Sequence, residues 1–456
     1  MIQTIQIDPT IAESMYLQIY RQFSEQIREG IIRTGEYLPS KRSLCDELKV
    51  SHSTVENAYQ LLMAEGYIES LPRKGYRVLE VLDLPEKKKS DTVMPAEDLE
   101  TSSFLSFSTG HVDTTAFPYT SWAKLYREVL YQSTDLLSRG DYRGELELRR
   151  ALKFYLTRYR GVTVNEDQII IAAGIDLLLD MLFHLLKPET IALEDPGYPA
   201  VNRMAALHGI QAIPIPVDKN GIKVSMLKQF PKTHLCFVTP SHQFPAGVTM
   251  SIGRRSQLLS WADTTNSLII EDDYDSEFRY TTRPIGALQG IDSTGRVIYL
   301  GTFSRSISPS VRVAYMVLPE TLMKQYEQKR GYHSCSVARL EQQVIARFLE
   351  NGMYQRHIRR TTRIYKARKE KLEQMLLSSF PGAWITGNEA GLHFVIHIPA
   401  KDPIRIIKNA KKYNLQLQQI KMPGTEDVFH LLIGFAGLKD SEMENLVHIL
   451  GESFSN

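Results

Sequence analysis

Apolar residues near the start of the chain recur with the spacing of helices. In residues 15–30 they share one face, which consists of Leu17, Tyr20, Phe23 and Ile27. Pro39 and Ser40 begin a second helix, and Ser51 is a suitable N-cap for a third. Two short strands follow, on either side of a basic turn at residues 72–74. A helix, a tight turn, a helix and a hairpin in this order predict a winged helix-turn-helix.

Beyond residue 104 the pattern changes to short apolar runs, rich in β-branched residues, that alternate with helical segments. The runs are residues 168–174, 190–195, 234–240, 267–273 and 297–303. Runs that are apolar on both faces and separated by helices are typical of a mostly parallel α/β sheet. We expect helices over residues 175–186 and 341–375 beside this sheet, and a smaller α+β subdomain at the C-terminal end.

Residues 80–103 follow neither pattern. They contain three consecutive lysines, two prolines and many acidic residues, which indicates a solvated tether. We therefore expect a winged helix-turn-helix domain at residues 13–81, a linker at 82–103 and a large α/β domain at 104–456. The lysine run at residues 87–89 is interpreted as part of the solvated tether and not as a DNA contact.

The composition of the 456 residues is that of a globular chain, with 43% hydrophobic and 23% charged residues. Three widely separated cysteines argue against a disulfide framework or a zinc site, and no metal site is predicted. The first residues lack the features of a secretory signal. No apolar stretch approaches the roughly 20 residues of a membrane-spanning helix. We therefore expect a cytoplasmic protein that does not contact a membrane.

The formal net charge of +2 does not by itself indicate a nucleic-acid partner. Residues 1–82 carry nine Lys and Arg against eleven Asp and Glu, but the basic residues gather around the second helix and in the wing. A winged helix contacts phosphates at those two places, and the start of its third helix contacts base edges. The predicted DNA contacts are Lys41, Arg42, His52, Ser53, Thr54, Asn57, Arg73 and Lys74. The alternative is a small helical domain with a solvated basic loop.

Two sets of motifs resemble known families. The pattern G-x-x-LPS-x-R-x-L, followed by VS-x-x-TV-x-x-AY-x-x-L-x-x-EG, resembles the GntR-type DNA-binding domain. In the large domain, GDYRGELELRRAL, EDPGYP, TPSHQFPAG, IIEDDYDSEFR and YLGTFSRSISPSVR resemble fold-type I pyridoxal-phosphate enzymes. The combination is similar to MocR-type transcription regulators, which join a GntR-type module to an aminotransferase-like domain.

The resemblance implies a pocket for pyridoxal 5'-phosphate at the carboxyl ends of the strands. Asp272 would face the pyridine nitrogen, Tyr274 the phenolic oxygen and Tyr198 the face of the ring. Tyr142 would enter the pocket from the second subunit of a homodimer. Helix amides, hydroxyl groups and a guanidinium would hold the phosphate. The residues assigned to the phosphate are Gly174, Ile175, Asp176, Thr302, Ser304 and Arg312.

Two departures from the family pattern bear on catalysis. Arg305 stands where the family has the lysine that bonds covalently to the cofactor. A guanidinium stays protonated and cannot act as the amine nucleophile. Aminotransferases also hold the substrate carboxylate with an arginine near the C-terminus, whereas this chain has none after Arg405 and offers only His430 in that region. Arg305 is left with three roles: pairing with the phosphate, pairing with an acidic ligand, or bridging to Asp272.

These observations lead to three hypotheses. In the first, the chain is a DNA-binding transcription regulator whose large domain binds a small effector, pyridoxal phosphate or a related ligand, without covalent attachment and without catalysis. In the second, the large domain is only a dimerisation scaffold. In the third, the chain is a working pyridoxal-phosphate-dependent aminotransferase with an accessory DNA-binding domain, which Arg305 disfavours.

Overall fold

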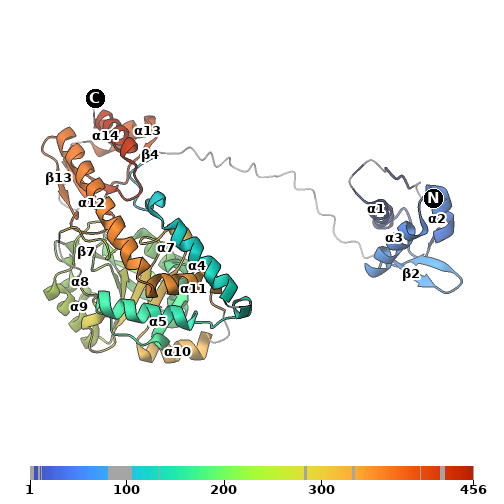
Figure 1. Cartoon of the computed structure of the whole chain (residues 1–456), viewed down its shortest axis with the longest axis horizontal. Coiled ribbons are helices and arrows are strands. Elements are labelled where there is room, and N and C mark those ends of the chain that lie inside the picture. The colour runs from blue at the N-terminus through green and yellow to red at the C-terminus, as the bar shows by residue number, and fades with distance from the viewer. Residues whose placement is uncertain are drawn as a thin grey trace. The chain divides into compact units, whose positions relative to one another are not determined.

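The computed structural model of the chain is shown in Figure 1. It describes residues 5–8, 11, 13–80, 105–132, 134–281, 285–330, 334–400, 402–421 and 427–454. The chain divides into two compact units, Met1–Ser102 and Ser103–Asn456, which are considered separately below. The predicted linker at residues 82–103 lies outside the described residues.

The small unit contains three helices and a three-stranded sheet. The helices are α1 (Met15–Arg28), α2 (Lys41–Leu48) and α3 (His52–Ala64). The strands β1 (Tyr37–Leu38), β2 (Ile68–Leu71) and β3 (Gly75–Val78) form an antiparallel sheet in the order β1-β3-β2. The Ser40 hydroxyl accepts from the Ser43 amide, and the Ser51 hydroxyl from the Thr54 amide, so both serines cap their helices as the sequence predicts.

The buried face of α1 differs from the predicted one. Phe23 and Ile27 are buried as expected, and Ile19 joins them, whereas Leu17 and Tyr20 are only half-buried. The Tyr20 hydroxyl instead donates to the Glu65 carboxylate at 2.5 Å, at the end of α3. The buried face of α1 is therefore rotated about the helix axis from the predicted one, because the polar hydroxyl of Tyr20 keeps that side chain partly at the surface. The strand β1 was not predicted, because two residues are too short to show a periodic pattern.

The large unit is built on an eight-stranded sheet with the order β5-β12-β11-β10-β9-β6-β7-β8. Its five predicted strands are present as β5 (Ile169–Ala172), β6 (Thr190–Asp195), β9 (Leu235–Val238), β10 (Leu268–Asp273) and β11 (Val297–Thr302). The strands β7 (Gln211–Asp218), β8 (Gly221–Ile222) and β12 (Ala314–Val317) complete it. Only β8 and β12 pair antiparallel to their neighbours, so the predicted mostly parallel sheet is confirmed.

Helices cover both faces of this sheet. One apolar cluster joins Ile170, Ile270 and Ile298 to α6 (Ile175–Leu186), α7 (Pro199–Leu207) and α10 (Glu320–Arg330). Residues of opposite parity in the strands pack against α4 (Tyr119–Gln132), α5 (Leu146–Tyr155) and α11 (Arg339–Glu350), or against α8 (Val224–Leu227) and α9 (Ile252–Thr264). Neighbouring residues of one strand therefore lie in different surroundings, as the pleat requires. Short helical turns connect these elements at Thr114–Ala116, Thr134–Leu137, Leu156–Arg160, Glu166–Gln168, Gln289–Ile291 and Pro309–Val311.

The helix predicted over residues 341–375 is two helices. The first, α11, ends at Glu350, and α12 (Met353–Ser379) begins after Gly352. Gly352 has a φ of +64°, in the left-handed region that glycine adopts without strain. The prediction of one helix was wrong because both segments are amphipathic and the Asn351–Gly352 pair between them was not counted as a break.

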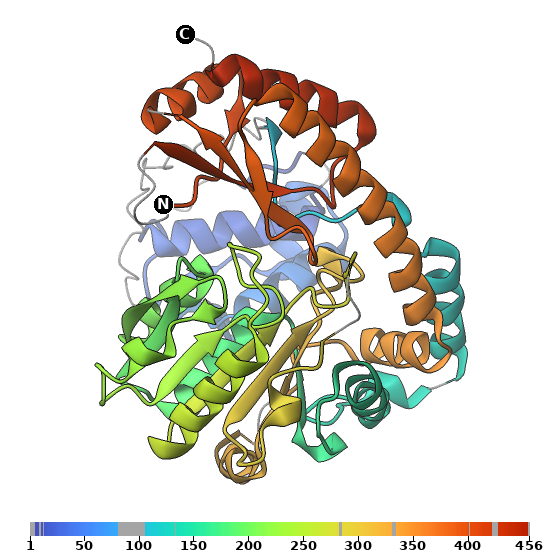
Figure 2. The ribbon, with the colours of Figure 1, turned by 90° about the vertical axis from the view of Figure 1, so that its left-hand side faces the viewer.

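The C-terminal end forms the smaller α+β subdomain that the sequence predicts, drawn in orange and red in Figure 2. Its antiparallel sheet contains β13 (Trp384–Thr386), β14 (His393–Pro399) and β16 (Val428–Gly434). Phe394 and Leu431 of this sheet share a core with α12, α13 (Pro403–Lys412) and α14 (Asp440–Phe454). A parallel pair of two-residue strands, β4 (Leu105–Ser106) and β15 (Leu415–Gln416), connects the subdomain to the start of the unit. Among the residues that the structure describes, no helix combines the length and apolar character needed to cross a membrane.

Candidate functional site

A cavity of about 200 Å³ lies where β10 and β11 end and where α6 begins. This is the edge of a parallel sheet at which ligands ordinarily bind. The structure brings together at this cavity nine residues that the sequence analysis singled out: Ile175, Asp176, Tyr198, Asp272, Tyr274, Thr302, Ser304, Arg305 and Arg312. Four further lining residues were not predicted: Gly110, Thr239, Phe244 and Pro309.

The N-terminus of α6 and Arg312 form one rim of the cavity. Gly174 is the N-cap of α6 and has a φ of +116°. A Cβ at this position would lie 2.5 Å from Arg312 Nη2, so any other residue would displace the guanidinium from its present place. The same nitrogen donates to the Ala173 carbonyl at 3.2 Å and lies 3.5 Å from Asp176 Oδ2. Helix amides beside a half-exposed guanidinium form an arrangement suited to an anion such as a phosphate.

Asp272 presents a buried carboxylate to the cavity. Its Oδ1 is buried and has no hydrogen-bond partner among the described residues. Burial, together with the nearby carboxylates of Asp273 and Asp275, raises the pKa of Asp272 to about 8, and Arg305 offsets only part of this rise. A buried carboxylate without a donor is unfavourable unless a partner supplies one. A ligand with a protonated ring nitrogen would supply this donor.

Tyr274 is held at the cavity wall by a polar network. Its hydroxyl donates to the His242 carbonyl at 2.9 Å and lies 3.3 Å from His242 Nδ1. The same Nδ1 lies 3.0 Å from Asp275 Oδ2. The His393 ring packs on His242 with 4.4 Å between centroids, and burial lowers the pKa of His393 well below its ordinary value. The network fixes the Tyr274 hydroxyl, and sequence reasoning missed its other members because they come from three separate segments.

An aromatic pair forms a further wall. The rings of Tyr198 and Phe244 meet edge to face with 5.6 Å between centroids. The Phe244 amide donates to Thr239 Oγ1 at 3.1 Å, and that hydroxyl donates to Glu194 Oε2 at 2.7 Å. The buried Glu194 thus positions the loop that carries Phe244. Sequence reasoning missed Thr239 and Phe244 because neither residue type indicates chemistry by itself.

Arg305 lines the cavity from the segment that follows β11. Its Nη1 donates to the Thr109 carbonyl, and among the described residues it forms no ion pair with Asp272. The Ser304 amide next to it donates to Thr302 Oγ1 at 3.1 Å, which fixes the start of the segment. No lysine is among the described residues that line the cavity. The bridge from Arg305 to Asp272, one of the three alternatives left by the sequence, is therefore absent from the structure.

Two predicted residues lie elsewhere in this chain. Tyr142 stacks on Tyr326, with 6.2 Å between centroids and 23° between the rings, and does not line the cavity. Its assignment requires a second subunit and stays a prediction. His430 lies on β16, where its Nδ1 is 2.6 Å from His397 Nδ1. Among the described residues, the cations that line the cavity are thus Arg305 and Arg312, and neither is near the C-terminus.

In the small unit, the start of α3 presents exposed polar groups. His52, Ser53 and Asn57 are exposed. The Thr54 and Ser53 hydroxyls each lie 2.8 Å from the capping hydroxyl of Ser51. These contacts orient the two hydroxyls at the start of α3, and their role in contacting base edges stays a prediction.

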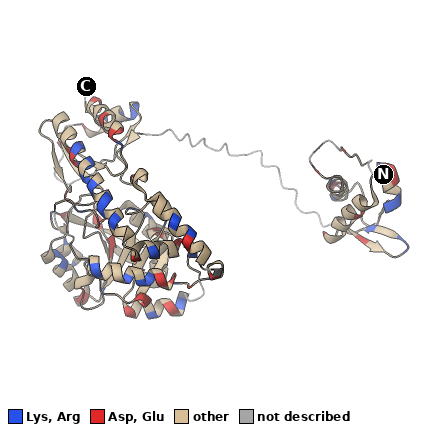
Figure 3. Ribbon diagram, viewed as in Figure 1, with Lys and Arg blue, Asp and Glu red and all other residues tan. Residues whose placement is uncertain are grey.

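The predicted phosphate contacts fall into two groups. Arg42, Arg73 and Lys74 are exposed, and Arg73, in the wing turn, has a φ of +64°. Figure 3 shows Lys and Arg in blue along the ribbon of this unit. Lys41 differs, because its ammonium is 2.8 Å from Glu56 Oε1 and its side chain is only 19% exposed. The hydrogen bond to Glu56 raises the pKa of Lys41. Lys41 therefore contributes to the packing of α2 against α3 more than to the free positive surface.

Comparison with known families agrees with the two units. Residues 15–78 match the family described as bacterial regulatory proteins, gntR family, and residues 102–450 match aminotransferase class I and II.

Similar proteins combine the same parts. The HTH-type transcriptional regulator YdeL of Bacillus subtilis is 38% identical over 96% of both chains. The probable rhizopine catabolism regulatory protein MocR of Rhizobium meliloti is 30% identical and covers 96% of this chain and 94% of its own. A solved structure of the kynurenine aminotransferase of Pyrococcus horikoshii, in complex with PMP, superposes with a TM-score of 0.68 at 25% identity, over 78% of this chain and 91% of that one.

Proposed function

Because the chain belongs to the family of MocR-type regulators, in which a gntR-type helix-turn-helix precedes an aminotransferase class I and II domain, we propose that it is a DNA-binding transcription regulator with a ligand-binding large domain. The ligand that fits best is pyridoxal 5'-phosphate or a close relative, bound without a covalent link. Double-stranded DNA is the partner of the small unit, and the chain acts in the cytoplasm as a homodimer that carries two DNA-binding units.

The observation that carries this proposal is the buried Oδ1 of Asp272, which has no hydrogen-bond partner among the described residues and lies at the wall of a cavity. A protonated pyridine nitrogen is a cationic donor of the kind that this carboxylate lacks. The other groups required by the same ligand surround it: the Tyr274 hydroxyl, the flat face of Tyr198 and an anion site at α6 and Arg312. The residues present therefore fit the group that the family binds.

Arg305 determines what the domain does with such a ligand. When bound in an enzyme, pyridoxal phosphate supplies an electron-withdrawing ring, and a lysine amine holds it covalently and moves protons. Arg305 stands at that lysine's position in the family pattern, its guanidinium stays protonated, and it is hydrogen-bonded to the Thr109 carbonyl. It cannot take up a proton from a substrate or form the covalent link. We therefore propose that the domain binds its ligand reversibly and does not catalyse transamination.

One observation favours the second candidate, a domain that serves only as a dimerisation scaffold. The cavity volume of about 200 Å³ is below the roughly 300–1,000 Å³ of ordinary ligand pockets. In that case Arg305 would close the site, and the protein would not respond to the ligand.

Calorimetric titration of the full-length protein with pyridoxal phosphate separates the two candidates. We expect one site per chain, and Asp272→Asn should raise the dissociation constant at least about tenfold, because asparagine cannot ionise to form the charged acceptor of the ring N–H. Asp263→Asn on the exposed surface of α9 is the matched control and should bind as the unaltered protein does. The absence of any heat in the unaltered protein would favour the scaffold. Equal affinities of the two variants would contradict the role of Asp272.

A further inference from the structure

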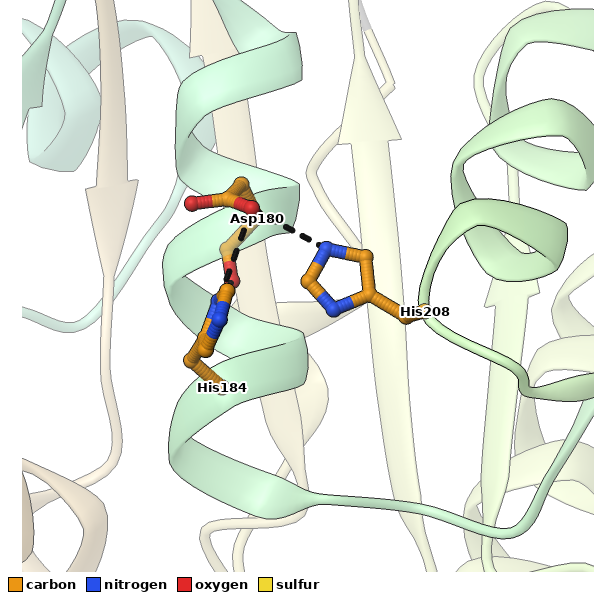
Figure 4. Close-up of side chains that lie close together, drawn as sticks. All are labelled: Asp180, His184 and His208. Atoms are coloured by element: carbon orange, nitrogen blue, oxygen red, sulfur yellow. Dashed lines mark hydrogen bonds and ion pairs between the residues drawn. The ribbon is translucent and has the colours of Figure 1, made fainter.

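Three side chains of types that can ligate metals lie together on the large unit, outside the lining of the cavity described above. Asp180 and His184 are one turn apart on α6, and His208 follows α7 directly (Figure 4). His208 Nε2 lies 3.0 Å from Asp180 Oδ1, and His184 Nδ1 lies 3.5 Å from the same oxygen. The three donor atoms all lie within 4.8 Å of one another.

We propose that these three residues bind a divalent zinc ion. Imidazole nitrogens and a carboxylate oxygen are ordinary zinc ligands, at about 2.0–2.2 Å. Ligand atoms at that distance around a tetrahedral ion are roughly 3.3 Å apart. The separations of the two imidazole nitrogens from Asp180 Oδ1, 3.0 and 3.5 Å, bracket this value. The two imidazole nitrogens lie within 4.8 Å of each other, so a shift of the exposed His184 side chain would complete the set.

The surroundings of the three residues favour a bound ion over an isolated hydrogen bond. The hydrogen bond between His208 and Asp180 accounts for one imidazole only. His184 adds a second, whose ring meets that of His208 edge to face with 4.7 Å between centroids. His184 Nδ1 also lies 2.9 Å from the Asp180 carbonyl, and this contact would be exchanged for coordination. Two neutral imidazoles and a carboxylate leave the zinc one net positive charge, which a water or an anion in a fourth position can share.

Access and rigidity also suit a metal site. The side chains of His184 and Asp180 are 54% and 41% exposed, so an ion can enter from solvent and keep one coordination position for water. His208 is 16% exposed and its ring packs edge to face on Phe183, with 5.5 Å between centroids. One ligand is therefore held by packing, and the helix spacing of four residues sets the other two on one face.

The position of the ion would connect two elements of the ligand cavity. The first turn of α6 contributes Ile175 and Asp176 to the cavity, and Tyr198 is the N-cap of α7. An ion bound by Asp180, His184 and His208 would join α6 to the end of α7 and would restrict the movement of these two helices against each other. The binding of zinc itself does not depend on the ligand proposed for the cavity.

A second group of the same residue types, His242, Asp275 and His393, is wholly buried and belongs to the network of Tyr274. The free cysteines at positions 45, 236 and 335 could also bind added zinc through their thiolates. The test must therefore assign any bound ion to its ligands.

The test is a titration of the full-length protein with zinc chloride against a chromophoric chelator, repeated with cobalt(II) to record the visible spectrum. We expect one ion per chain, bound by nitrogen and oxygen without the intense near-ultraviolet band of cobalt–thiolate bonds. His184→Ala and Asp180→Asn should each weaken binding more than about tenfold, a loss that even an outer partner of a ligand can cause. His234→Ala removes an exposed histidine outside the cluster and serves as the matched control.

Zinc should also raise the melting temperature of the unaltered protein and of His234→Ala, but not that of His184→Ala, because an ion that binds only the folded state stabilises it. His184 is exposed, so its replacement should leave the metal-free melting temperature unchanged. Lack of binding by the unaltered protein would overturn the proposal. So would equal affinities of His184→Ala and His234→Ala, or a thiolate band in the cobalt spectrum.

Discussion

Asp272 and Asp273 are neighbours on β10, yet they face opposite sides of the sheet and opposite chemical surroundings. Asp273 Oδ2 accepts from Arg160 Nε and from the Tyr299 hydroxyl, both at 2.7 Å. Burial by itself would raise the pKa of Asp273, but the Arg160 charge and these hydrogen bonds outweigh it and lower the pKa. Asp272 has no cation at hydrogen-bond distance among the described residues, and burial raises its pKa to about 8.

The difference teaches how a charge with a structural role can be distinguished from one kept for a ligand. Both carboxylates keep an Oδ1 without a hydrogen bond, but only Asp273 has a cation at its other oxygen. Asp273 thus forms a buried ion pair that helps hold the sheet to the turn after α5, where Arg160 lies. Burial of the Asp272 carboxylate is unfavourable, and no cation at hydrogen-bond distance offsets it among the described residues. The residue also lines a cavity, which is typical of a binding residue.

The largest expected effect is a loss of stability on breaking the buried ion pair between Arg160 and Asp273. Arg160 and Asp273 are 3% and 1% exposed, so Arg160→Ala leaves a buried carboxylate without its cation. We expect the free energy of unfolding to fall by about 3–5 kcal/mol. Urea denaturation at neutral pH measures it. Asp272→Asn is the comparison and should not destabilise the protein, so a similar loss in both variants would abolish the distinction.

The two carboxylates should also give opposite dependences of stability on pH. The folded-state pKa of Asp272 is raised from 3.8 to about 8, so its contribution is fully present below pH 3.8 and is lost as the pH rises toward about 8. Asp272→Asn should therefore gain stability relative to the unaltered protein between pH 5 and 8.

The pKa of Asp273 is lowered, so its contribution is present above its ordinary value and is lost as the pH falls through the folded-state value. Urea denaturation of both asparagine variants, from below the folded-state pKa of Asp273 up to pH 8, measures these contributions. A stability difference between Asp272→Asn and the unaltered protein that stays constant from pH 5 to 8 would show that Asp272 is ionised throughout, and the cavity would then have to be more polar than the structure indicates.

The small unit offers the same contrast between a paired and an exposed charge, and here we expect a smaller effect, on DNA binding. Lys41 is paired with Glu56, whereas Lys74 is exposed. Lys74→Ala should weaken binding to all DNA sequences and reduce the slope of log affinity against log salt by about 1. Lys41→Ala should change the slope less, because its charge is already neutralised by a neighbour. Fluorescence anisotropy with labelled duplexes at several salt concentrations measures the slopes, and equal slopes for the two variants would contradict the contrast.

The contrast between Asp272 and Asp273 could be predicted only in part. The run of apolar β-branched residues that ends in two aspartates indicated a buried strand, and the family motif assigned Asp272 to the cavity. The partner of Asp273 could not be predicted, because Arg160 is 113 residues away in sequence. The hydrogen bond of Thr239 to Glu194, which supports the loop of Phe244, was also missed, because Glu194 lies 45 residues from Thr239. Residue types in a motif indicate the chemistry of a site. Whether a buried charge in that site has an oppositely charged partner depends on contacts that only the fold supplies.

The central claim, a reversible ligand site in which Arg305 replaces a covalent link, is tested most directly at residue 305. The unaltered protein and Arg305→Lys are each mixed with pyridoxal phosphate, their visible spectra are recorded, and both are reduced with borohydride, dialysed and digested for mass spectrometry. We predict that the unaltered protein stays colourless in the visible and carries no cofactor after dialysis, whereas Arg305→Lys turns yellow and is labelled on the peptide that contains residue 305. Labelling of the unaltered protein, or a variant that stays colourless and unlabelled, would contradict the account.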